Sequence, residues 1–169
     1  QALARLQHPG IAKVFDAGRT ESGRPWLAME LVEGEPITLH CRARRSSLER
    51  RLHLFAQVCT AVQHAHNQGL VHLDLKPANV LVTQCQGEER PVVIDFGLAR
   101  AAGERTASDG GLRGTPDYMS PEQIVDGGSV DTRTDVHALG LLLYELVCGE
   151  RAFGSRRDAG GLDAVLEDI

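Results

Sequence analysis

Lysine is scarce in this chain. Of its 18 Lys and Arg residues, only Lys13 and Lys76 are lysine, and the arginines are scattered rather than gathered into a stripe. The formal net charge is −5. This charge pattern argues against nucleic acid as a partner. The 169 residues fit one domain with an ordinary apolar content, and they contain no internal repeat or low-complexity tract.

Paired cysteines and long apolar runs are also missing. The four cysteines have no C-x-x-C spacing, which argues against a zinc site and against a disulfide framework. We expect reduced thiols in a cytoplasmic setting. His64 and His66 lie two residues apart, so one helix cannot aim both at one metal ion. The longest apolar run, residues 138–147, contains Glu145 and is too short to span a bilayer, so we expect no membrane contact by this segment.

Hydrophobic periodicity predicts a β-rich first part. Residues 1–7 are typical of the last turns of a helix that ends at His8-Pro9-Gly10. Residues 11–17 and 26–32 favour strands, and the turn composition between them predicts a hairpin. After Pro36 the pattern becomes helical.

The second part is predicted to be mostly helical. The segment Ser46-Ser47-Leu48-Glu49 is typical of a capping box, and it introduces a helix that ends at Gly69. Short strands are expected at 79–82 and 92–94, joined by polar residues 83–90, and residues 101–114 are expected to form an exposed loop. A core helix, apolar nearly all round, is predicted over 135–148 with Gly149 as its C-cap. The expected apolar face of the earlier helix consists of Leu52, Phe55, Ala56, Cys59 and Val62.

Two short segments carry the residues most suited to chemistry. They read HLDLKPAN at 72–79 and IDFG at 94–97. Asn79 and Asp95 provide the hard oxygen ligands that Mg²⁺ prefers. Asp74 can orient a hydroxyl nucleophile and accept its proton, and Lys76 can stabilise charge on a transferring phosphoryl group. The set therefore predicts phosphoryl transfer.

These segments resemble the catalytic and magnesium loops of eukaryotic-type Ser/Thr protein kinases, of the bacterial type. GTPDYMSPE at 114–122 is similar to the end of that family's activation segment, DVHALG at 135–140 to the start of its central helix, and MELV at 29–32 to the hinge between its lobes. The resemblance covers nearly the whole chain. It implies an α+β, two-lobe protein-kinase-like fold. Residues 1–33 would be the end of the small lobe and the hinge, and residues 34–169 a large lobe truncated after the central helix.

The resemblance also implies an activity and a site. The activity is ATP-dependent phosphoryl transfer to Ser or Thr hydroxyls of a protein substrate, with ATP and Mg²⁺ as cofactors. Lys76 is the Ser/Thr-kinase choice at its position, and Thr115 matches the threonine that contacts Asp74 and Lys76. Asp135 is given the task of holding the catalytic loop through its backbone. The residues implied beside the nucleotide are Met29, Glu30, Val32 and Leu81.

Three further residues of these motifs are interpreted as structural. His72 is expected to be a packed histidine rather than a catalyst. Phe96 is expected in the core beneath the magnesium loop. Glu122 is expected to pair with an arginine farther along than this chain extends.

The sequence departs from the family pattern in two places. Leu73 stands where many kinases have the arginine that binds activation-loop phosphate, so we expect activity not to need phosphorylation of Thr106 or Ser108. No G-x-G-x-x-G occurs, and Lys13 lies too late to be the small-lobe lysine. The glutamate partner of that lysine would precede Gln1. We therefore expect a fragment of a longer reading frame that alone binds MgATP poorly, with open hairpin edges and an exposed apolar patch on the central helix.

Two alternatives remain open. Small-molecule phosphotransferases of the aminoglycoside type share the H-x-D-x-x-x-x-N loop, but they usually lack a lysine at position 76 and a segment like 114–122. A non-catalytic pseudokinase or scaffold has no chemical need for the acids, lysine and carboxamide retained here. The sequence names neither the protein substrate nor the oligomeric state, and a longer parent could be anchored to a membrane through another segment.

Overall fold

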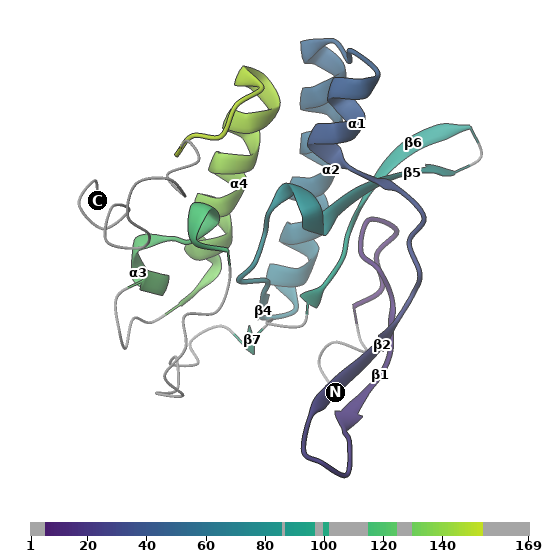
Figure 1. Ribbon diagram of the computed structural model, residues 1–169, viewed down its shortest axis with the longest axis vertical. Coiled ribbons are helices and arrows are strands. Elements are labelled where there is room, and N and C mark those ends of the chain that lie inside the picture. Colours follow the sequence, from purple (N-terminus) through teal and green to yellow (C-terminus); the bar gives the residue numbers. More distant parts are fainter. Residues whose placement is uncertain (1–5, 86, 97–99, 102–114, 125–129, 154–169) are drawn as a thin grey trace.

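The chain folds as a mixed α+β structure of helices packed beside small antiparallel sheets (Figure 1). The computed structural model describes residues 6–85, 87–96, 100–101, 115–124 and 130–153. In these ranges the α-helices are α1 (Ile37–Ala43), α2 (Leu48–Asn67), α3 (Pro121–Ile124) and α4 (Thr132–Cys148). The strands are β1 (Val14–Arg19), β2 (Pro25–Met29), β3 (Glu35–Pro36), β4 (Leu70–Val71), β5 (Val80–Cys85), β6 (Glu88–Val93) and β7 (Arg100–Ala101).

The main core lies where α2 packs between β6 and α4. Side chains from α1, α2, β5, β6 and α4 form one buried cluster, which includes Ile37, Leu54, Val80 and Leu142 at 0% exposure. The α+β class predicted from the sequence is confirmed. The segment 72–79 lies between β4 and β5, directly against this cluster.

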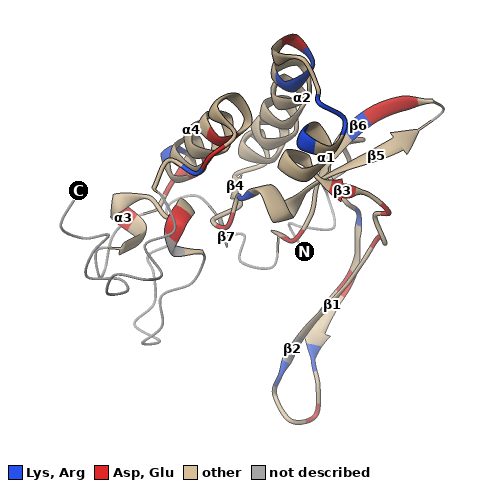
Figure 2. Ribbon diagram, turned by 45° about the horizontal axis from the view of Figure 1, so that its top comes forward, with Lys and Arg blue, Asp and Glu red and all other residues tan. Residues whose placement is uncertain are grey.

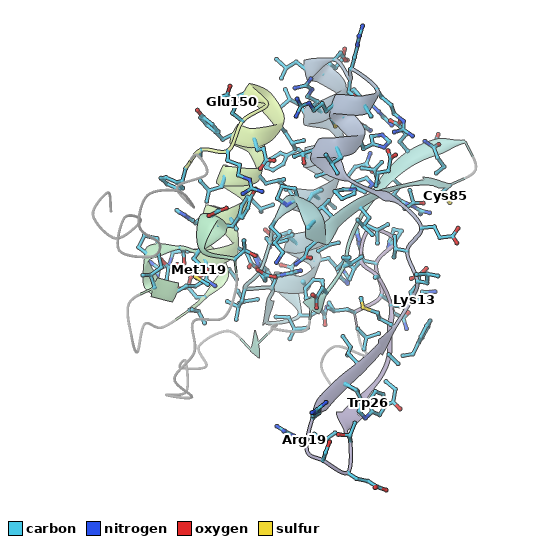
Figure 3. All side chains as sticks on the ribbon, viewed as in Figure 1. Lys13, Arg19, Trp26, Cys85, Met119 and Glu150 are labelled. Atoms are coloured by element: carbon cyan, nitrogen blue, oxygen red, sulfur yellow. The ribbon has the colours of Figure 1, made fainter. Side chains whose placement is uncertain are left out.

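Strands β1 and β2 form the predicted hairpin, which projects away from the helices (Figure 1). Its ends differ from the prediction because Ile11 leaves the hairpin and bridges to Val93 of β6, while residues 31–32 lie outside any strand. Trp26 stacks over Gly18, where a Cβ would lie only 2.8 Å from the indole ring. Figure 3 shows Trp26 near the far end of the hairpin. Phe15 on β1 is 67% exposed.

Helix α2 begins one residue later than the predicted capping box. Ser47, not Ser46, is the N-cap, and its side chain accepts a hydrogen bond from the backbone N–H of Arg50 at 3.2 Å. Glu49 therefore lies in the first turn, where its charge favours the helix dipole, and not at the capping-box position. Beyond the helix end, Gly69 has a φ of +73°, which confirms the predicted stop.

The buried face of α2 also differs from the predicted one. The side chains that face β6 and α4 follow the helical spacing Leu54, Val58, Ala61 and Ala65, with Val62 beside them. Leu52 was predicted in this face but is 42% exposed. The prediction followed a neighbouring apolar stripe, of which Phe55 and Cys59 are only partly buried against the core.

Strands β5 and β6 extend through the predicted polar connection. Thr83, Gln84 and Cys85 continue the ladder with Arg90, Glu89 and Glu88, and the turn includes Gly87 at a φ of +85°. Polar residues are accommodated in these strands because the Glu89 carboxylate has partners on two helices. It lies 2.8 Å from the guanidinium group of Arg50 on α2 and 3.0 Å from the ring of the buried His40 on α1. Figure 2 shows this acidic part of β6 beside the basic residues of α1 and α2.

Helix α4 starts three residues before its predicted beginning, with Asp131 as N-cap. Its end is as predicted, because Gly149 adopts the left-handed C-cap conformation with a φ of +80°. The helix is not buried all round. Ala138, Leu139, Leu142 and Leu146 are buried, whereas Val136, Tyr144 and Val147 are between 45% and 59% exposed.

Some predictions fall outside the described residues. These include most of the helix at residues 1–7, of which Leu6 and Gln7 are not helical, and the loop from residue 102 to 114. Within the described part, the four cysteines are free. No helix of the described ranges is long and apolar enough to cross a bilayer.

Candidate functional site

The loop that carries Asp74 is held from below by α4. Asp135, which is 1% exposed, accepts the backbone N–H of His72 at 2.8 Å and that of Leu73 at 3.0 Å. The ring of His66, near the end of α2, contacts the same carboxylate at 2.7 Å. A buried carboxylate with several donors is a strong anchor because its charge is compensated locally. The role expected for Asp135 is confirmed.

His72 is a fully buried part of this loop. Its Nδ1 accepts the backbone N–H of Asp74 at 3.2 Å, and its Nε2 lies 3.0 Å from the carbonyl oxygen of Ile94. This pairing uses the neutral imidazole with its proton on Nε2. Burial lowers the pKa of His72, in keeping with a neutral ring. The ring also lies 4.5 Å from that of Phe96, which is buried, so both residues have the packing roles predicted for them.

Asp74, Lys76 and Thr115 form one compact hydrogen-bonded group. The Nζ atom of Lys76 lies 2.7 Å from Oδ2 of Asp74 and 2.6 Å from Oγ1 of Thr115. Thr115 donates its backbone N–H to Oδ1 of Asp74 at 3.0 Å. The Asp74 and Lys76 side chains are 10% and 24% exposed, so the carboxylate is partly shielded yet reachable. Thr115 comes from a distant part of the chain, and its position here could not be read from spacing alone.

Asn79 and Asp95 flank this group. The side-chain amide of Asn79 donates to the backbone oxygen of Asp74 at 2.8 Å and to its Oδ2 at 3.1 Å, which turns the amide oxygen away from that carboxylate. The backbone of Asn79 receives the N–H of Ile94 at 2.9 Å, and this bond sets Asp95 beside the same loop. Asp95 has a φ of +62°, a strained conformation for a residue other than glycine and one that recurs at functional sites.

Comparison with known proteins decides the family. A family model described as the protein kinase domain matches residues 1–168. The DNA damage-responsive serine/threonine-protein kinase RqkA of Deinococcus radiodurans is 42% identical over 90% of this chain and 23% of its own length. The chain belongs to the protein kinase family.

Two further kinase relatives agree with this assignment. The serine/threonine-protein kinase PknJ of Mycobacterium tuberculosis is 38% identical over 96% of this chain, and PknB of the same organism is 36% identical over 90%. The chain spans about a quarter of the length of these relatives, 27% of PknJ and 25% of PknB. The resemblance to bacterial Ser/Thr kinases that the motifs indicated is therefore confirmed.

The four residues that the kinase resemblance places beside the nucleotide do not all line one cavity. Glu30 and Val32 line a cavity of about 300 Å³ together with residues of β5 and β6, but Leu81 and Met29 do not line it. Gly34 brings the segment before α1 against β5, since a Cβ there would lie 2.7 Å from the backbone oxygen of Val82 and 3.2 Å from the Cβ of Leu81. Half-buried Leu81 thus neighbours Gly34 without lining the cavity of Glu30 and Val32.

Sequence reasoning missed two residues that support the loop carrying Asp74. His66 was weighed only as a metal ligand, yet it binds Asp135, and the described residues contain no cluster of three His, Cys, Asp or Glu side chains suited to a metal ion. Gln123 of α3 donates its side-chain amide to the backbone oxygen of Leu73 at 2.8 Å. Neither contact has a local sequence signal, because each joins elements far apart in the chain.

The segment after Thr115 is tied to α4. The Tyr118 hydroxyl donates to the Glu145 carboxylate, and burial together with that carboxylate raises the pKa of Tyr118. Glu122 accepts the Thr134 hydroxyl at 2.8 Å, so it has a structural partner on α4. Labelled Met119 lies in this segment in Figure 3 and is buried. The segment 115–124 therefore packs against α4, the helix whose Asp135 holds the loop that carries Asp74.

Proposed function

We propose that this chain carries the phosphoryl-transfer site of a bacterial-type Ser/Thr protein kinase, which moves the γ-phosphoryl group of ATP to a Ser or Thr hydroxyl of a protein. The observation that carries the proposal is the group formed by Asp74, Lys76 and Thr115, with every contact at 3.2 Å or less. Family membership alone supports the fold, whereas this geometry supports the chemistry.

Asp74 is proposed as the residue that orients the substrate hydroxyl and accepts its proton. Its Oδ1 is bound by Thr115 and its Oδ2 by Lys76 and Asn79, so the carboxylate is held in one orientation before substrate arrives. Such preorganisation lowers the barrier because little rearrangement is needed during the reaction. Lys76 places its ammonium group 2.7 Å from Oδ2 of this carboxylate and is proposed to stabilise the charge of the transferring group.

Asn79 and Asp95 fit Mg²⁺ as a cofactor. They offer an amide oxygen and a carboxylate, the hard donors that Mg²⁺ takes alongside phosphate oxygens. With these two residues as its protein ligands, the metal would be shared between protein and nucleotide. When bound with ATP, Mg²⁺ would reduce the negative charge that repels an incoming hydroxyl. Two oxygen ligands suit that shared arrangement better than a metal site built from protein groups alone.

The nucleotide is proposed to lie between two lobes that divide near residue 33. The backbone of Glu30 and Val32 would face the adenine edge, with Met29 beside it and Leu81 beneath the ring. The backbone N–H of Glu30 is bonded to the carbonyl oxygen of Lys13 at 2.8 Å, and the Lys13 N–H to the Glu30 carboxylate at 3.1 Å. These bonds hold Glu30 at the end of the hairpin, next to β5.

A transfer assay tests this proposal. The protein expressed at the full length of its gene is incubated with labelled ATP, Mg²⁺ and peptides that differ only in a Ser, Thr or Tyr acceptor. We expect label on Ser and Thr and no transfer when Mg²⁺ is chelated. Tyr labelling, or transfer only to small molecules, would contradict the proposed substrate class. Nucleotide binding with no transfer to any acceptor would instead support the pseudokinase alternative.

A further inference from the structure

The peptide group that joins Leu73 to Asp74 is held at both ends. Its carbonyl oxygen accepts the side-chain amide of Gln123 at 2.8 Å, and its N–H donates to Nδ1 of His72 at 3.2 Å. Because a peptide group is planar, these two bonds fix the orientation of the whole unit. The plane leads directly into the Cα of Asp74, so its rotation would swing the carboxylate.

Leu73 needs such support because its backbone is strained. Its φ is +72°, in the left-handed region that disfavours residues with a Cβ. Asp135 binds the N–H on one side of Leu73, and Gln123 binds the carbonyl on the other. Conformations of this kind persist only where surrounding contacts over-determine them.

The orientation of the Gln123 side chain is itself fixed. Its Oε1 accepts the backbone N–H of Ser120 at 3.0 Å and lies 3.4 Å from the Ser120 hydroxyl. Ser120 is fully buried. With the oxygen committed to Ser120, the Nε2 donor points toward Leu73. One side chain therefore joins the segment that supplies Thr115 to the peptide that precedes Asp74.

We propose that Gln123 is a positioning residue for the proposed phosphoryl transfer: it holds the Leu73–Asp74 peptide group in register with the segment that carries Thr115. The role rests on the proposed function but extends it to a residue outside the catalytic group. It acts through the backbone and touches neither substrate nor nucleotide. Losing it should slow the chemical step while leaving nucleotide affinity unchanged.

The test uses substitutions that separate the two bonds of Gln123. Gln123→Glu keeps an acceptor for Ser120 but loses the donor to Leu73, whereas Gln123→Met loses both. The matched control is Gln63→Glu on α2, which makes the same change at an exposed amide that donates to Asn67 at 3.0 Å. Each variant is made in the protein expressed at the full length of its gene. The readouts are kcat, KM for ATP and amide hydrogen exchange of the segment 72–76.

For Gln123→Glu we expect kcat to fall about ten- to a hundredfold, with KM for ATP within about twofold, because a partly buried carbonyl loses its partner. Exchange of segment 72–76 should quicken by about tenfold or more, and Gln123→Met should show at least the same losses. Behaviour of Gln123→Glu equal to that of the Gln63→Glu control would overturn the role. Losses in Gln123→Met but not in Gln123→Glu would also overturn it, since the bond to Ser120, and not the bond to Leu73, would then be the one that matters. If the unaltered protein transfers no phosphate, the proposed function fails, and the exchange measurement still decides whether Gln123 positions the loop.

Discussion

Asp135→Asn is expected to loosen the attachment of the loop at residues 72–79 to α4. In the structure the buried carboxylate accepts two backbone N–H groups and contacts the ring of His66, at distances from 2.7 to 3.0 Å. An Asn side chain keeps one acceptor oxygen, and its NH₂ group faces an N–H that has lost its partner. Each hydrogen bond to a charged acceptor contributes about 1.5–3 kcal/mol, and removing the buried charge recovers part of that loss.

The expected net loss is therefore about 3–5 kcal/mol in the free energy of unfolding. It is measured by urea unfolding followed by far-ultraviolet circular dichroism. The control is Asp131→Asn at the exposed N-cap of the same helix, where Asn caps about as well as Asp and a loss of about 0.5 kcal/mol or less is expected. Equal, small losses in the two variants would show that the Asp135 contacts do not hold the loop.

Three other predictions concern the site. Thr115→Val removes the hydroxyl partner of Lys76 and should lower kcat about tenfold or more, whereas Thr115→Ser should stay within about threefold. Similar rates for the two variants would show that the Thr115 hydroxyl does not contribute to transfer. Burial lowers the pKa of His72 below its usual 6.5, and burial also lowers the pKa of His8. As the pH falls, the unfolded chain therefore binds protons at these two rings before the folded chain does. Stability should thus fall as the pH drops below about 6.5, by up to about 1.4 kcal/mol per pH unit for one group, and unfolding curves that do not change from about pH 7.5 to 5.5 would contradict this. Replacing Thr106 and Ser108, which lie outside the described residues, by Ala should leave turnover of the full-length protein within about twofold; a large loss would show that loop phosphorylation matters despite Leu73.

The sequence predicts the chemistry-bearing part of the site because each of those residues lies in a short, ordered motif. Asp74, Lys76 and Asn79 share one loop, so their proximity follows from local chain geometry. The end of α4 was also predictable, since Gly149 supplies the left-handed conformation that ends a helix.

Other features depend on tertiary contacts that no local pattern contains. Helix α2 offers neighbouring apolar stripes, and only packing against β6 and α4 selects the one through Leu54. Strands β5 and β6 run through polar residues because Glu89 has ionic partners on two helices. Gln123 meets Leu73 across 50 positions of sequence, so that contact became visible only in the structure.

The most direct test of the central claim is to measure phosphate transfer and ATP binding in the same samples of Asp74→Asn. The account predicts that transfer to a Ser peptide falls at least about a thousandfold while the dissociation constant for MgATP changes by less than about threefold, because Asp74 is proposed to act on the hydroxyl and not on the nucleotide. Asp131→Asn in parallel should keep both values. Transfer at the unaltered rate by Asp74→Asn would contradict the assignment of this carboxylate, and with it the proposed mechanism.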